Sequence, residues 1–176
     1  MKLLTRRQRE ALQEKFRPEQ IRLLFVGEAP PASGRFFYSG NSGLYRAMRE
    51  AFKAVDPRIN DENFLDVFQA SGCYLVDLCP MPVDRLNTES RRRARSAGER
   101  RLRERLIELR PVKIAAMLRA IADHVTNSAV SANWRGEILE LPYPGRWSRH
   151  RAKFVKALEP SLRELLLAPG LRGADR

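Results

Sequence analysis

Hydrophobic positions along the chain follow two periods, one typical of buried strands and one typical of amphipathic helices. Four short segments are expected to form strands, residues 21–26, 73–78, 112–118 and 136–141, and the first of them is almost continuously apolar. Runs of this kind are typical of strands that helices cover on both faces. Because the runs alternate with helical segments, the pattern predicts an α/β fold with three αβα layers and a central four-stranded, mainly parallel sheet.

Helices are expected where apolar residues recur every three or four positions between polar caps and helix-ending prolines or glycines. These segments are 5–16, 41–55, 60–72, 87–110, 121–125 and 148–158. Residues 128–135 are expected to form a polar loop, and Pro160 is expected to begin a last helix. Residues 1–167 are predicted to form one domain, with a disordered tail at 168–176.

The predicted helix at 87–110 is unusual because its first half has almost no apolar face. We expect this half to project into solvent, while leucines further along dock the second half on the core. Its arginines are candidates for phosphate contacts: Arg91, Arg92, Arg93 and Arg95. The alternative is a solvated, partly frayed helix start.

The chain carries 33 lysines and arginines against 21 aspartates and glutamates, a formal net charge of +12. Such an excess favours a polyanionic partner, nucleic acid above all, and the alternative is a basic but solvated surface. No apolar segment has the length of a membrane span and no signal peptide is visible, so we expect a cytoplasmic protein without membrane contact, and a monomer. Cys73 and Cys79 cannot complete a four-ligand metal site, and we expect reduced core thiols and no cofactor.

Three polar loops follow strand ends and are expected to meet at one edge of the sheet: residues 27–40, 77–87 and 142–149. Ligands of open α/β sheets bind at this edge. The first loop joins Glu28 to two prolines and a run of aromatic residues, which is typical of a binding or catalytic site; the alternative is an ordinary strand-to-helix loop. Asp77 is either a site residue or a satisfied polar group.

The motifs in these loops resemble those of the uracil-DNA glycosylase superfamily. GEAPPASGRFFYSG resembles the first active-site motif of the iron–sulfur type of bacterial and archaeal uracil-DNA glycosylases. GNSGLYRAM is similar to a region of the mismatch-specific uracil/thymine glycosylases. YLVDLCP and LPYPGRW fall where the superfamily has an asparagine at a strand end and a His-Pro motif. The similarity spans about residues 21–158 in the right order and spacing.

The resemblance implies a DNA-binding enzyme, acting on DNA that includes single-stranded or mismatched forms. It would flip a damaged or deaminated base and hydrolyse the N-glycosidic bond. Glu28 would be catalytic and assist the attack of water. The implied base-binding residues are Gly27, Ala29, Phe37, Asp77 and Leu141, with Phe37 stacking on the base. The implied DNA contacts are Ser39, Asn41, Pro142, Tyr143, Pro144, Gly145, Arg146, Trp147, Arg149 and Arg151, with Arg146 and Trp147 as wedge and plug.

The chain also departs from the superfamily pattern. Asp77 stands in place of the asparagine, and an ionised aspartate only accepts hydrogen bonds, so a base that presents donors is a further possible substrate. Leu141 stands in place of the histidine, for which Arg146 or His150 would have to substitute, and the cluster cysteines are missing. Alternatives are a member that binds nucleic acid without turnover, and an α/β enzyme acting on a free nucleotide. Phe37 and Trp147 have core packing as their alternative role.

Overall fold

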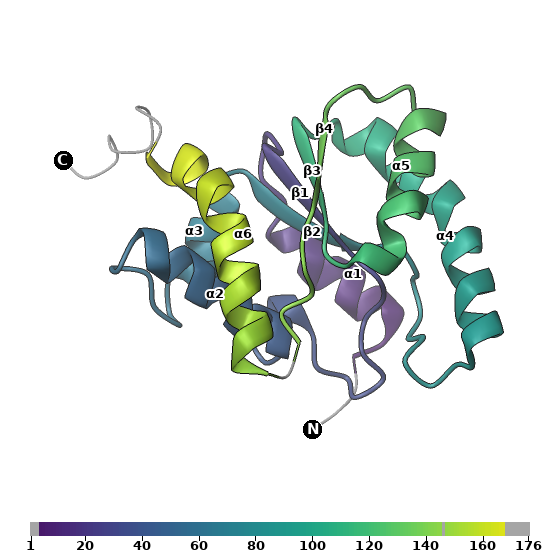
Figure 1. Ribbon diagram of the computed structural model, residues 1–176, viewed down its shortest axis with the longest axis horizontal. Helices are drawn as coiled ribbons and strands as arrows, with labels where there is room; N and C mark the ends of the chain where they lie inside the picture. The colour runs from purple at the N-terminus through teal and green to yellow at the C-terminus, as the bar shows by residue number, and fades with distance from the viewer. Residues whose placement is uncertain (1–3, 146, 168–176) are drawn as a thin grey trace.

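The computed structural model describes residues 4–145 and 147–167, in which four parallel strands form a central sheet (Figure 1). These strands are β1 (Leu23–Gly27), β2 (Cys73–Asp77), β3 (Lys113–Ala116) and β4 (Glu137–Glu140), and they lie in the order β2-β1-β3-β4. Each neighbouring pair is parallel. β1 is interior and buried along its whole length, as its unbroken apolar sequence predicts.

Helices cover both faces of this sheet (Figure 1). One side carries α2 (Gly43–Val55), α3 (Phe64–Ala70) and α6 (Ser148–Leu167), and the other carries α4 (Thr88–Leu109) and α5 (Ala122–Ser131). α1 (Arg6–Lys15) lies beside β2, and two short 3-10 turns occupy Phe37–Ser39 and Arg119–Ile121. The predicted three-layer α/β fold is therefore confirmed. Among the described residues, no helix is both long enough and apolar enough to cross a membrane.

At Leu75, side chains rather than another strand satisfy the backbone on the outer edge of β2. The hydroxyl of Tyr38 accepts a hydrogen bond from the Leu75 amide at 2.7 Å and donates to the Leu75 carbonyl oxygen at 3.0 Å. Gln13 of α1 donates to the same carbonyl oxygen. A buried tyrosine thus supplies the bonds that a further strand would make. Because Tyr38 belongs to the loop after β1, this contact fixes that loop against the sheet.

α6 is one continuous helix, so the prediction that Pro160 begins a separate helix is wrong. Proline removes one hydrogen bond from a helix interior and crowds the preceding turn. The buried side chains of Phe154, Leu158, Leu162 and Leu165 nevertheless stay on one face across the proline. Packing of this face against the core outweighs the local cost.

α5 continues to Ser131, and the prediction of a loop from residue 128 is wrong over its first residues. Ser128 is buried, and its hydroxyl donates to the carbonyl oxygens of His124 at 2.7 Å and Glu99 at 3.2 Å. Its polar group is therefore satisfied inside the structure, which allows a serine to face α4 in a helix.

The first half of α4 lies against the protein, although we expected it to project into solvent. Gly98 is buried against the carbonyl oxygen of Leu78, and Ala94 packs on the core. Arg91 and Arg95 reach the loop after β1. One inward stripe runs along the whole helix at positions 91, 95, 98, 102, 106 and 109. Its first two positions are arginines rather than apolar residues, so no apolar pattern marks this part of the stripe.

Candidate active site

A cavity of about 580 Å³ opens at the carboxyl ends of β1, β2 and β3. Its wall combines the loop after β1, the first turn of α2, the end of β2 with the loop that follows it, two residues after β3, Arg91 of α4 and one residue of the loop before α6. The amide of Ala32 donates to the Asp84 carboxylate at 3.2 Å, which joins the first two loops. The three loops predicted to gather at this edge do so.

Glu28 lies at this cavity and is fixed by two arginines of α4. Arg91 donates from Nε to Oε1 at 2.7 Å and from Nη2 to Oε2. Arg95 donates from Nε to Oε1 at 2.7 Å, and its Nη2 lies 2.6 Å from the same oxygen. The Glu28 side chain is only 11% exposed. Burial alone would raise its pKa, but hydrogen bonds from Arg91 and Arg95 and their charges hold the pKa of Glu28 below its ordinary value. Glu28 is therefore an ionised carboxylate in a fixed orientation.

Asp77 is a second carboxyl on the cavity wall, at the last position of β2. It pairs in register with Gly27, the last residue of β1. A Cβ on Gly27 would lie 2.6 Å from Oδ1 of Asp77, so the absence of a side chain at Gly27 gives the carboxyl its place. Shielding from solvent raises the pKa of Asp77 to about 7, with Arg101 and Arg9 opposing the shift and Glu28 adding to it.

Phe37 lines the cavity and also belongs to a buried aromatic cluster. Its ring centroid lies 5.0 Å from that of Tyr38 and 5.2 Å from that of Phe68. Both Phe36 and Phe37 are buried, so the structure does not separate one core ring from one site ring. Ser42 caps α2 by accepting a hydrogen bond from the Tyr45 amide at 3.0 Å, which fixes the helix start on the opposite wall.

The loop before α6 contributes Tyr143 to the cavity wall and carries Trp147, which is 63% exposed. Pro142 and Arg149 are also exposed, whereas Pro144 is buried. Gly145 has a φ of 55°, a left-handed conformation that favours glycine, and it lies against His150. Arg146, the predicted wedge, lies outside the described residues, as does the predicted tail at 168–176.

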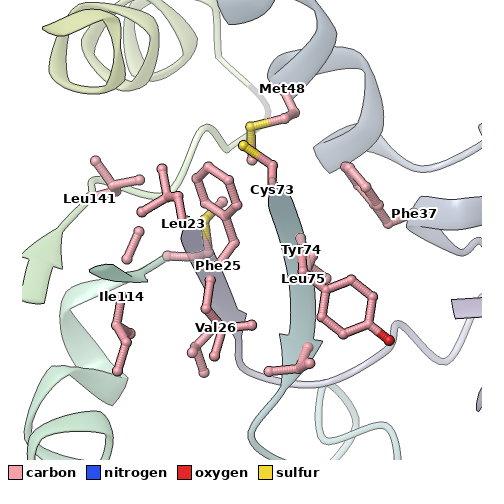
Figure 2. Close-up of a cluster of buried hydrophobic side chains, with 14 of the residues drawn as sticks. Leu23, Phe25, Val26, Phe37, Met48, Cys73, Tyr74, Leu75, Ile114 and Leu141 are labelled. Carbon is pink, nitrogen blue, oxygen red and sulfur yellow. The ribbon is translucent and has the colours of Figure 1, made fainter. Parts of the chain in front are cut away.

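Leu141, expected at the base, lies in the hydrophobic core with 4% exposure. Its amide donates to the Ala116 carbonyl oxygen at 2.9 Å, which extends the β3–β4 pairing. In Figure 2, Leu141 and Phe37 lie on opposite sides of β1 and β2. The structure therefore brings Glu28, Ala29, Phe37 and Asp77 together around the cavity and keeps Leu141 apart from them.

Of the remaining predicted DNA contacts, Ser39 is exposed at the end of its 3-10 turn. The side-chain oxygen of Asn41 accepts a hydrogen bond from the Phe36 amide at 2.7 Å, so it shapes the loop after β1. Arg151 lies 3.5 Å from Glu50 in a half-exposed ion pair. These residues lie in the loop after β1 and at the start of α6.

Sequence reasoning missed the roles of Arg91 and Arg95. The available signal was their spacing of four, which puts both on the stripe that continues into Gly98 and Leu102. This spacing does not indicate that their partner is Glu28, which precedes Arg91 by 63 residues and Arg95 by 67. Across residues 4–145 and 147–167, no three His, Cys, Asp or Glu side chains gather in a way that could hold a metal ion.

The fold and this cavity define a three-layer α/β protein whose ligand site lies at the carboxyl ends of parallel strands. The family model of the Uracil DNA glycosylase superfamily matches residues 14–166, which include every strand and the whole cavity. The chain belongs to this superfamily, whose members act on DNA. The comparison with curated proteins gives no match.

Proposed function

We propose that the protein is a DNA glycosylase that draws a damaged or deaminated base into the cavity and hydrolyses its N-glycosidic bond. The observation that carries the proposal is the fixed, ionised Glu28 on the wall of a cavity in the size range of small-molecule sites. A base stacked in a duplex is out of reach of such a carboxylate, so the base has to leave the stack.

Glu28 suits the charge that develops during this reaction. The bond between sugar and base breaks through an oxocarbenium-like state, and a nearby carboxylate stabilises the positive sugar. Oε1 accepts from both arginines, whereas Oε2 accepts from Arg91. Oε2 therefore retains a lone pair for a water molecule. That water would bond to the anomeric carbon and pass a proton by way of Glu28 to the base, which leaves with the electron pair of the broken bond.

The base would lie between the carboxyl groups and the aromatic wall. Phe36, Phe37 and Tyr143 all line the cavity, and ring faces bind flat heterocycles of either purine or pyrimidine type. Trp147 and Arg149 are exposed and follow Tyr143 closely in the chain, so that an aromatic ring is available to fill the gap left by the base and a guanidinium to hold phosphate. We expect DNA affinity to fall with salt, given the net charge of +12.

The second candidate is a member that binds DNA without turnover. Two observations favour it. Arg91 and Arg95 both donate to Oε1 of Glu28, so this oxygen is already occupied. Leu141 is buried in the core, and its side chain cannot donate the hydrogen bond to the leaving base that a histidine at this position would donate. Loss of one such donor typically lowers the rate by about 10²–10³-fold.

One experiment separates the two candidates. Labelled single-stranded and duplex oligonucleotides, each with one uracil, hypoxanthine, xanthine or mismatched thymine, are incubated with wild-type protein and the Glu28→Gln variant, and abasic-site cleavage is measured. We expect base release by the wild type and about 10²–10³-fold less by Glu28→Gln, because the neutral amide stabilises the cation poorly. Glu62→Gln, an exposed glutamate on the loop before α3, is the matched control and should equal the wild type.

DNA affinity, measured on the same oligonucleotides at several salt concentrations, shows whether the Glu28→Gln variant is folded and still binds DNA. Release of no base together with salt-dependent binding would establish the second candidate. Base release that is unchanged in Glu28→Gln would remove Glu28 from the mechanism.

A further inference from the structure

The Asp77 carboxyl has a position that the mechanism above leaves without a task. It lies on the wall of the cavity that Glu28, Leu75 and Phe37 also line. Within the described part of the chain, no side chain or amide donates a hydrogen bond to it, and no lysine or arginine forms an ion pair with it. A carboxyl group that faces a cavity without a protein partner is available to a ligand.

The charged groups nearest to Asp77 are engaged elsewhere. Arg9 of α1 donates to the carbonyl oxygens of Leu4 at 3.0 Å and Pro80 at 3.4 Å. Arg101 of α4 donates to Glu10 at 3.0 Å. The carboxylate of Glu28, which faces Asp77 from the loop after β1, adds negative charge. The surrounding charges therefore compensate an ionised Asp77 only weakly.

Besides the charged side chains of Arg35, Asp84 and Arg91 on the same cavity wall, three titratable groups close to Asp77 are neutral near pH 7. They are Tyr38 on its 3-10 turn, Cys79 after β2 and Tyr143 before α6. Desolvation, with the charge of Asp77 adding to it, raises the pKa of each of the three. The proton balance of this part of the cavity consequently depends on Asp77, whose pKa is raised to about 7, while Glu28 stays ionised.

The two protonation states of Asp77 offer different hydrogen bonds. A neutral carboxyl has one O–H donor and one carbonyl acceptor side by side, whereas a carboxylate has acceptors only. A base edge that presents a carbonyl oxygen next to a ring N–H fits the neutral form. The same edge places its carbonyl oxygen against an acceptor when the carboxyl is ionised, which leaves both unsatisfied.

We propose that Asp77 is the specificity-determining residue of the cavity and that it reads the base as a neutral carboxylic acid, donating to a carbonyl oxygen and accepting from the adjacent ring N–H, as on uracil. This inference rests on the proposed function of the site. It predicts that recognition of uracil weakens as Asp77 loses its proton, although Glu28 is ionised throughout that range.

The test is the pH dependence of uracil release from a single-stranded oligonucleotide, between about pH 5.5 and 9, for wild type and Asp77→Asn. We expect kcat/KM of the wild type to fall by up to about tenfold per pH unit above neutrality. Asp77→Asn should keep its rate across the range, because an amide presents a donor and an acceptor at every pH. Asp66→Asn, an exposed aspartate of α3, is the matched control and should show the wild-type fall.

Affinity of the Glu28→Gln variant for the uracil oligonucleotide, with and without Asp77→Asn, is measured over the same pH range. If both proteins release uracil and kcat/KM falls equally with rising pH in Asp77→Asn and in the wild type, the inference is overturned. The glycosylase proposal would then still stand. Without turnover, an affinity that falls with pH only when Asp77 is present would support the inference while the hydrolytic function fails. An affinity with the same pH dependence in both forms would overturn it.

Discussion

The position of α4 against the sheet depends on Gly98, and we expect that replacing this glycine by alanine destabilises the protein. Gly98 lies in the middle of the helix, where its backbone approaches the carbonyl oxygen of Leu78 just after β2. Replacing it by alanine adds one methyl group at that contact. The same helix carries Arg91 and Arg95 to Glu28, so a shift of α4 also acts on the candidate site.

The expected effect is the difference between two opposed contributions. Alanine is favoured over glycine in a helix interior by about 0.5–1 kcal/mol. The new Cβ, however, would lie 2.5 Å from the Leu78 carbonyl oxygen and 3.0 Å from its Cγ, and the oxygen belongs to the backbone. The helix has to move, and overpacking of this kind costs about 1–3 kcal/mol. We therefore expect Gly98→Ala to lower the free energy of unfolding by about 0.5–2 kcal/mol, or Tm by about 1–8 °C.

Thermal unfolding followed by circular dichroism measures this change. Gly43→Ala is the matched control, because a Cβ at this first residue of α2 meets nothing within 4 Å, and its Tm should stay the same or rise. We further expect slower base release by Gly98→Ala, because a shift of α4 moves Arg91 and Arg95 away from Glu28 and leaves this carboxylate less firmly held. A Gly98→Ala variant at least as stable as the wild type would refute the close approach of α4 to Leu78.

Two further substitutions test the fold around the site. Tyr38→Phe leaves the buried Leu75 amide without its partner and should cost about 1–3 kcal/mol of unfolding free energy, measured by denaturant titration. Tyr143→Phe, on an exposed side chain, is the control, and an equal loss in both would contradict the edge contact. Leu141→Ala should cost about 2–5 kcal/mol through the cavity left in the core, with base release per folded molecule unchanged. Slower release at full stability would instead place Leu141 at the base.

β1 and β2 were predictable because parallel strands covered on both faces need unbroken apolar runs, as residues 23–26 and 73–76 have. The continuity of α6 through Pro160 was not predictable. The sequence shows the proline, which disfavours a helix interior, but it does not show the tertiary packing that offsets this cost. The candidate site was likewise predictable in part. Topology brings the ends of β1 and β2 together, so a shared cavity for Glu28 and Asp77 was predictable.

The partners of these carboxyls could not be predicted. Arg91 and Arg95 meet Glu28 only because Gly98 allows α4 to lie close to the sheet. Within 87–110, a run of arginines looks the same whether its side chains face solvent or a carboxylate. The sequence therefore indicates which residues carry charge, whereas the charge state of each carboxyl depends on contacts across more than sixty residues.

These contacts determine which of the two carboxyls holds a proton. Glu28 and Asp77 share one cavity, and ionising either one makes ionisation of the other less favourable. The arginine pair stabilises the charge on Glu28, whereas shielding from solvent raises the pKa of Asp77, whose nearest arginines are engaged elsewhere. Without this asymmetry the two groups would compete for the proton, and neither role would be secure. Arg91 and Arg95 thus keep Glu28 charged, as the proposed stabilisation of a sugar cation requires, and leave the proton to Asp77, as the proposed reading of the base requires.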